Sequence, residues 1–183
     1  MKQILYLVTT CTILFTSCTN DVAGTSDVFT NPLDPETAEE TGFLTPAVVF
    51  FPARATTSVG GGVTLDIHAM EVDSIAGSHI QVSYNKAKLT LLSLSQGSFY
   101  DGAPEMLFYY EDDTNVGLID IYSGFLGVDS AFVSGTGQLA SMVFTTISAG
   151  VSTVSFTYES EFVDPLDNPI EILGYGTSEV VAE

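Results

Sequence analysis

The stretch that decides the fold is VTLDIHAM at residues 63–70, in which apolar and polar side chains alternate one by one as far as Ala69. A second stretch, HIQVSY at residues 79–84, repeats this period of two. Successive side chains of a β-strand point to opposite faces of a sheet, so this period predicts strands with one buried face and one outward face. The turn residues Ala76-Gly77 separate the two stretches and predict a tight connection between them.

The same signals recur along the rest of the chain, and no window shows a helical period. Further strand candidates lie at residues 48–51, 89–94, 106–110, 116–122, 138–146, 151–158, 170–173 and 178–181. Turn sequences separate them, at residues 60–62, 85–86, 112–115, 135–137 and 167–169. This spacing predicts an all-β fold over residues 46–183, an antiparallel β-sandwich with a jelly-roll topology of about nine strands.

The first 17 residues predict a secretion signal. An apolar run of 12 residues, 4–15, precedes small polar residues and is shorter than the roughly 20 residues of a spanning helix. The run Phe15-Thr16-Ser17-Cys18 resembles the lipobox of bacterial lipoproteins. The resemblance implies cleavage before Cys18 and lipid attachment to it, with Thr19 favouring the outer membrane or cell surface. We therefore expect an extracytoplasmic protein that contacts the membrane through its lipid only; an ordinary secretory signal is the alternative.

Residues 18–45 predict an acidic, disordered spacer. The segment is rich in Asp, Glu, Thr, Pro and Gly and has few apolar residues. Pro32 and Pro35 argue against a helix, and the repelling charges would extend the chain. The expected domains are therefore a signal at 1–17, a spacer at 18–45 and a folded domain at 46–183.

Charge and cysteine content exclude several functions. Without the leader, three basic residues (Arg54, Lys86 and Lys88) face 23 acidic ones, 3 minus 23 or a net charge of −20. Such a chain repels polyphosphate and lacks basic clusters, so nucleic acid is excluded as a partner. No cysteine follows Cys18, which excludes disulfides, cysteine zinc sites and thiol nucleophiles from the folded domain.

A series of landmarks over residues 46–183 resembles a cohesin domain. They are VVFFP at 48–52, AGSHIQVSY at 76–84, GSF at 97–99, GTGQLASMVF at 135–144, Gly150, VSF at 154–156 and GTSEV at 176–180. The resemblance implies a non-catalytic module that docks a protein partner, a dockerin borne by polysaccharide-degrading enzymes. Carbohydrate-binding modules share much of this outline, so polysaccharide binding is the alternative function.

The resemblance places the partner on the sheet that contains residues 79–84 and the strands near 106–122. If Ile80 and Val82 face the core, the side chains between them face outward, and the same holds around Ile119 and Ile121. The candidate partner-binding residues are His79, Gln81, Ser83, Leu118, Asp120 and Tyr122. Alternatively, the second strand has the reversed register, with Leu118 and Tyr122 in the core.

No catalytic set is predicted, since the two histidines, His68 and His79, lie in separate strands. Neither histidine has a serine or carboxylate at a sequence spacing that would indicate a catalytic pair. Two oxygen-rich stretches, at 111–113 and 164–171, lack the spacing of a calcium loop, so no metal ligand and no cofactor is predicted. If the partner is a dockerin, calcium would be expected on the partner. For sugar binding the chain has no Trp; its candidate rings are Tyr100, Tyr109, Tyr110, Tyr122 and Tyr175.

Overall fold

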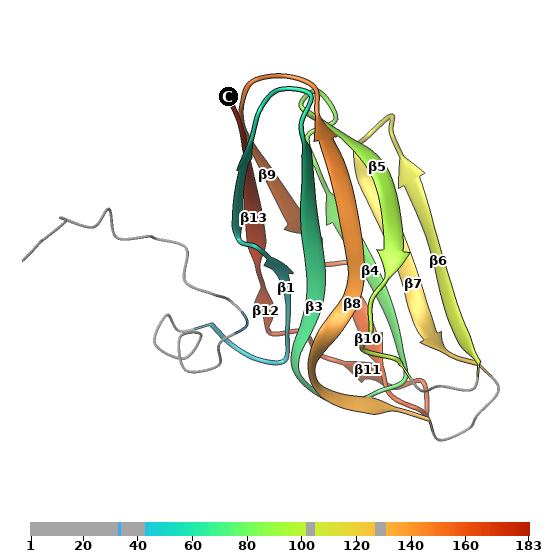
Figure 1. Cartoon of the computed structure of the whole chain (residues 1–183). Coiled ribbons are helices and arrows are strands. Elements are labelled where there is room, and N and C mark those ends of the chain that lie inside the picture. Colours follow the sequence, from blue (N-terminus) through green and yellow to red (C-terminus); the bar gives the residue numbers. More distant parts are fainter. Residues whose placement is uncertain (1–32, 34–42, 102–104, 127–130) are drawn as a thin grey trace, which may run out of the picture.

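The structure is a computed structural model that describes residues 33, 43–101, 105–126 and 131–183. The predicted signal, Cys18 and nearly all of the predicted spacer lie outside the described residues. No described segment forms a helix with the length and apolarity needed to cross a membrane. The described residues form thirteen β-strands arranged in two facing sheets (Figure 1).

The first sheet has the strand order β12-β1-β3-β8-β5. Its strands are β1 (Ala47–Phe51), β3 (Gly62–Ile75), β5 (Leu89–Gln96), β8 (Val133–Thr146) and β12 (Gly174–Tyr175). The long strands β3 and β8 pair antiparallel along most of their length and form the centre of this layer.

The second sheet has the order β11-β10-β4-β9-β13-β2, and β7 also pairs with β4 while β6 pairs with β7. Its strands are β2 (Arg54–Thr57), β4 (Gly77–Ser83), β6 (Met106–Asp113), β7 (Leu118–Phe125), β9 (Gly150–Phe156), β10 (Glu161–Val163), β11 (Pro169–Ile170) and β13 (Thr177–Ala182). Strand β4 pairs with β7 along its whole length, with β10 at its start and with β9 at its end. β4 is therefore a central strand of this layer.

The all-β sandwich is confirmed, but the strand count and the purely antiparallel pairing need correction. The structure has thirteen strands instead of about nine, and two pairings, β1 with β12 and β13 with β2, are parallel. The strands missed by the sequence pattern, β2, β10 and β12, are two to four residues long, and the strand predicted at residues 170–173 is shorter and begins earlier, at β11. So short a segment cannot show an alternating period, and its pairing depends on the neighbouring strand.

The predicted turn at residues 135–137 lies inside β8. Gly135 has φ +102° and pairs with Val72 where the register against β3 shifts. A β-bulge needs this backbone conformation, and glycine adopts it without a steric penalty. The glycines in this stretch therefore mark a bulge within a long strand.

The core lies between the two sheets and is built from the predicted inward faces. Leu65 and Ile67 of β3 and Ile80 and Val82 of β4 are almost fully buried. The ring of Phe50 stacks on that of Phe156 with centroids 4.0 Å apart and an interplanar angle of 5°. The described residues contain no cysteine, so this apolar packing stabilises the domain without disulfides.

A second, smaller apolar cluster lies on the outer side of the first sheet. Ala47, Val49 and Met70 are fully buried there, although they point away from the main core. Leu33 and Phe43, which belong to the predicted spacer, pack against them. The N-terminal segment thus contributes two side chains that cover part of the sheet formed by β1 and β3.

Candidate functional site

The six predicted binding residues lie together on the outer face of β4 and β7. They form three cross-strand pairs: His79 with Tyr122, Gln81 with Asp120, and Ser83 with Leu118. Ile80, Val82, Ile119 and Ile121 are buried on the opposite face. The predicted outward register is confirmed and the reversed register of β7 is excluded, while the role of these residues in binding stays a prediction.

A row of three aromatic rings crosses this face. Tyr109 of β6 pairs with Tyr122, which pairs with His79. The His79 and Tyr122 rings are stacked at 4.6 Å and 6°, and the Tyr122 and Tyr109 rings at 6.3 Å and 24°. Each ring therefore holds its neighbour upright, which fixes the side chains before any ligand binds.

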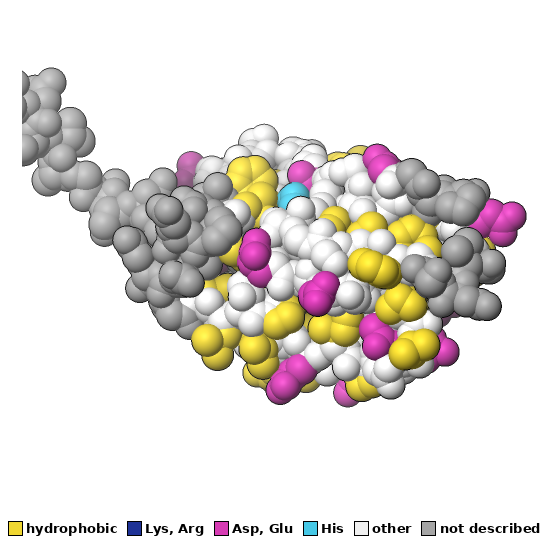
Figure 2. All heavy atoms as spheres, turned by 90° about the horizontal axis from the view of Figure 1, so that it is seen from below, with side chains coloured by type: hydrophobic (Ala, Val, Ile, Leu, Met, Phe, Trp, Pro, Cys, Tyr) yellow, Lys and Arg dark blue, Asp and Glu magenta, His cyan; other side chains and the backbone are white. Residues whose placement is uncertain are grey.

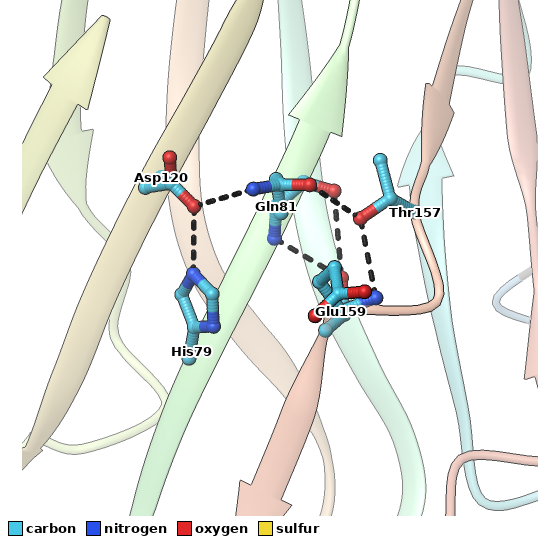
Figure 3. Close-up of polar contacts among 6 residues, drawn as sticks. His79, Gln81, Asp120, Thr157 and Glu159 are labelled. Carbon is cyan, nitrogen blue, oxygen red and sulfur yellow. Dashed lines mark hydrogen bonds and ion pairs between the residues drawn. The ribbon is translucent and has the colours of Figure 1, made fainter.

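A chain of polar contacts runs beside the ring row (Figure 3). His79 Nε2 and Gln81 Nε2 both donate to Asp120 Oδ1, at 2.7 and 2.9 Å. Thr157 Oγ1 donates to Gln81 Oε1 at 2.8 Å, and the Gln81 backbone N–H donates to Ser160 Oγ at 3.0 Å. The network links β4, β7 and the segment after β9, so the polar part of the face is also preorganised.

The pKa values of two phenols on this face are raised, each for a different main reason. Tyr109 donates a 2.6 Å hydrogen bond to the Glu111 carboxylate, and this bond, followed by lost hydration, raises the pKa of Tyr109. Lost hydration, followed by the charges of Asp120 and Glu111, raises the pKa of Tyr122. Both hydroxyls are therefore neutral at physiological pH; that of Tyr122 can donate a hydrogen bond to a partner, whereas that of Tyr109 already donates to Glu111.

The strands of this face carry acids but no Lys or Arg. The strands β4, β6, β7 and β10 contain Glu111, Asp120 and Glu161 among others, and no Lys or Arg. Arg54 lies in β2, at the far end of the second sheet, and Lys88 Nζ donates to the Val151 carbonyl at 2.8 Å. Lys86 follows β4, and its Nζ donates to the Asn115 carbonyl in the turn between β6 and β7. Figure 2 shows one end of the sandwich, where acidic side chains lie among apolar ones and no Lys or Arg is visible. A positively charged partner surface would complement this face.

Comparisons with solved structures fit the arrangement of the two sheets. The sequence matches no family model and no curated protein. A type II cohesin domain from the cellulosome of Acetivibrio cellulolyticus superposes with a TM-score of 0.63 at 16% identity, covering 74% of this chain and 95% of that one. A non-cellulosomal cohesin from Archaeoglobus fulgidus superposes with a TM-score of 0.59 at 17% identity, covering 74% and 92%.

The chain has a cohesin fold. A third match is a type I cohesin from Clostridium thermocellum in complex with a dockerin, with a TM-score of 0.61, 18% identity, and coverage of 75% of this chain and 94% of that one. These superpositions span most of each cohesin, so the likeness covers the whole sandwich. The fold expected from the sequence landmarks is thereby confirmed.

Several residues of the cohesin-like face were not anticipated from the sequence. Tyr109, Thr157 and Glu161 come from β6, the turn after β9, and β10, and Glu161 pairs with His79. Alternation along residues 106–110 did indicate that Tyr109 and Tyr110 point to opposite sides, but not which of them joins Tyr122. No local signal marks Glu161, because its position depends on the pairing of a three-residue strand.

Four of the five tyrosines considered for sugar stacking do not form an open platform in this cohesin-like sandwich, and the fifth, Tyr110, is partly exposed on the other side of β6 from Tyr109. Tyr100 is 1% exposed. The rings of Tyr109 and Tyr122 are stacked on one another, and Tyr175 packs edge to face against Tyr158 at 5.2 Å. A pyranose ring requires a free aromatic face, so this arrangement does not favour sugar binding on the sheet.

The acidic loops of the cohesin-like domain are explained by turn chemistry. Asp164 Oδ1 accepts hydrogen bonds from the backbone N–H groups of Leu166 (2.7 Å) and Asn168 (2.9 Å), and Asp113 Oδ1 accepts one from Asn115 (2.9 Å). In the part of the chain that the structure describes, no group of three or more His, Cys, Asp or Glu could hold a metal ion.

The Asp164 turn gives a pH-dependent contribution to stability. Hydrogen bonds from Asn168 hold the pKa of Asp164 below its ordinary value of 3.8. A lowered pKa stabilises the folded state above that ordinary value, and the stabilisation is lost as the pH falls through the folded-state pKa. We expect Asp164→Ala to lower the Tm by a few degrees at pH 7 and the difference to shrink in acid, with Glu171→Ala as the control. An equal loss at pH 7 and in strong acid would contradict this account of the turn.

Proposed function

We propose that this protein is a non-catalytic docking module that holds a protein partner of the dockerin class on the outer face of β4, β6 and β7. The observation that carries the proposal is the preorganised face on a cohesin fold: three stacked rings bordered by a connected polar network. Protein interfaces draw most of their binding free energy from a few aromatic anchors on a prearranged surface.

The geometry of the rings favours a protein over a polysaccharide. Because the rings of Tyr109, Tyr122 and His79 stand side by side, they present their edges and polar atoms to solvent. Upright rings suit the ridges and grooves of a protein surface, whereas sugar stacking requires flat, exposed ring faces. His68, the other histidine, lies in β3 of the opposite sheet, so the two histidines do not form a catalytic pair.

The proposal of a dockerin-class partner is supported by structures of similar proteins in complex with dockerins. The Clostridium thermocellum cohesin and a cohesin of Acetivibrio cellulolyticus scaffoldin B are both found in complex with dockerins. The full chain, immobilised and incubated with the organism's secreted proteins, should retain a protein with paired calcium-binding loops. Retention should require calcium, which the partner would carry. Failure to retain any such protein, with or without chelator, would count against docking.

We further infer that the module is attached by lipid at Cys18 to the bacterial outer membrane or cell surface. This inference is supported by the apolar run at 4–15 and the lipobox-like residues 15–18. Cells grown with a labelled fatty acid should yield a labelled protein, and Cys18→Ser should yield an unlabelled one. A labelled Cys18→Ser protein would place the lipid elsewhere.

A further inference from the structure

A trough runs beside the aromatic row, one step further along the strands. The next outward positions are Leu107 of β6, Gly124 of β7, Gly77 of β4 and Val163 of β10, and they pair in this order across the sheet. The two central residues have no side chain, so the sheet is hollow between Leu107 and Val163. A Cβ atom on Gly77 would lie 3.1 Å from Val163 Cγ2, which shows how narrow this hollow is.

The hollow beside the rings has mainly apolar walls and one acidic edge, whereas the second hollow further along is lined mainly by polar atoms. The hollow beside the rings has a volume of about 220 Å³ and is lined by Leu107, Tyr122, His79, Val163 and Glu161. It continues into a second hollow of about 380 Å³ that shares Leu107 and Val163 and reaches Asp164 and Asp167. An elongated side chain with an apolar stem would fit between these walls.

Some polar groups of the trough already have hydrogen-bond partners within the protein, and others do not. Below the glycines, the Ser78 and Ser123 hydroxyls bond to each other at 2.7 Å, and the Tyr100 hydroxyl donates to Ser78 at 3.3 Å. The carboxylate of Asp164 accepts the turn hydrogen bonds described above. The Glu161 side chain is exposed, and its carboxylate has no hydrogen bond or ion pair with the described residues. Glu161, in the hollow beside the rings, and Asp167, in the second hollow, are thus the carboxylates of the trough that no described residue pairs, and Glu161 is the one next to the rings.

We propose that this trough receives one long basic side chain, arginine or lysine, from the docked partner. The methylene stem would lie between Leu107 and Val163, and the cationic group would meet Glu161 beside the His79 ring, which lies between Glu161 and Tyr122. Charge complementarity supports a basic occupant, since the strands of this face contain no Lys or Arg and the chain has a formal net charge of −19. The inference rests on the proposed function and specifies which partner residue the face recognises.

The test uses three matched probes and amide NMR spectra of the full chain. N-acetylarginine methylamide should cause saturable shifts at the amides of Gly77, Ser123 and Gly124. The citrulline analogue, which has the same shape without the charge, and the norleucine analogue should bind about two- to fivefold more weakly, the range expected of a solvent-exposed ion pair.

Two substitutions should remove this response. Gly77→Val fills the trough and should abolish the saturable shifts, whereas Gly62→Val is the matched control in β3. A Cβ atom at Gly62 would meet only the Phe144 carbonyl oxygen, at 3.9 Å. Glu161→Gln keeps the size of the side chain and should equalise the arginine and citrulline probes.

The other outcomes either overturn the inference or separate it from the proposed docking function. Equal binding of the arginine and norleucine probes would show that the trough binds an aliphatic side chain without recognising its charge. Unsaturable shifts spread over many acidic residues would show that the probe binds the acidic surface non-specifically. The absence of shifts would show that the trough does not bind a basic side chain. If a partner is retained but binds Gly77→Val unchanged, the trough inference fails and docking stands. If the arginine probe binds but no partner is retained, docking fails and the basic specificity stands.

Discussion

Tyr122→Ala is expected to weaken partner binding by about 2 to 4 kcal/mol, or roughly 30- to 1000-fold, as replacement of a central aromatic anchor does in other interfaces. Tyr122 is the middle ring of the row, and its loss leaves His79 and Tyr109 without the neighbour that holds them upright. It also removes one wall of the hollow beside Leu107. The affinity can be measured by titration calorimetry with the retained partner.

The matched control is Tyr110→Ala. Tyr110 neighbours Tyr109 in β6 and is exposed to a similar degree as Tyr122, 38% against 37%, but alternation places it on the other side of the strand. This variant should bind within about threefold of the original chain, because residues outside a hot spot contribute little. Thermal unfolding should show that both variants remain folded, because a partly exposed ring contributes little to the stability of the domain. Equal losses of affinity in the two variants would move the binding site off this face.

Phe144→Ala is expected to lower the free energy of unfolding by about 3 to 5 kcal/mol, the usual cost of a large-to-small change in a core. Phe144 is fully buried in β8, and its ring lies 5.3 Å from that of Tyr84. The described domain has no disulfide to offset the loss, and a total stability of about 5 to 15 kcal/mol is typical of a single domain. Urea unfolding followed by tyrosine fluorescence measures the difference.

Leu92→Ala provides the control in the adjacent strand. Leu92 belongs to β5, which pairs with β8, and it is 69% exposed. Its removal should change the free energy of unfolding by less than about 0.5 kcal/mol, as surface changes usually do. A similar loss in both variants would mean that the core does not lie between the sheets as described.

The sequence is most informative where strands are long and one face is buried. In β3, β4 and β7 the alternation of side chains assigns the faces correctly, because a slip of one residue would place every apolar side chain in water. Outward orientation of the six candidate residues follows directly from this. Their cross-strand pairing does not, since the sequence contains no information on which residue of β7 lies opposite His79.

The remaining features depend on contacts between distant segments. Glu161 reaches the face through β10, whose three residues have no readable period. The trough results from Gly77 and Gly124 lying opposite each other, which each glycine alone does not indicate. Leu33 and Phe43 lie in a polar, proline-containing stretch, and their apolar partners are recognisable only once β1 and β3 are paired. In each case the position of the residue is set by pairing between strands that are distant in the sequence.

The small cluster around Val49 has a mechanical consequence. The N-terminal segment packs on the outside of one sheet, whereas the aromatic row lies on the outside of the other. A pulling force between the N-terminal end and a docked partner would therefore act across the thickness of the sandwich. Under that tension the force would reach the contacts of Leu33 and Phe43 with this cluster before it reached the pairing of β1 with β3. These contacts would therefore be loaded before the folded core.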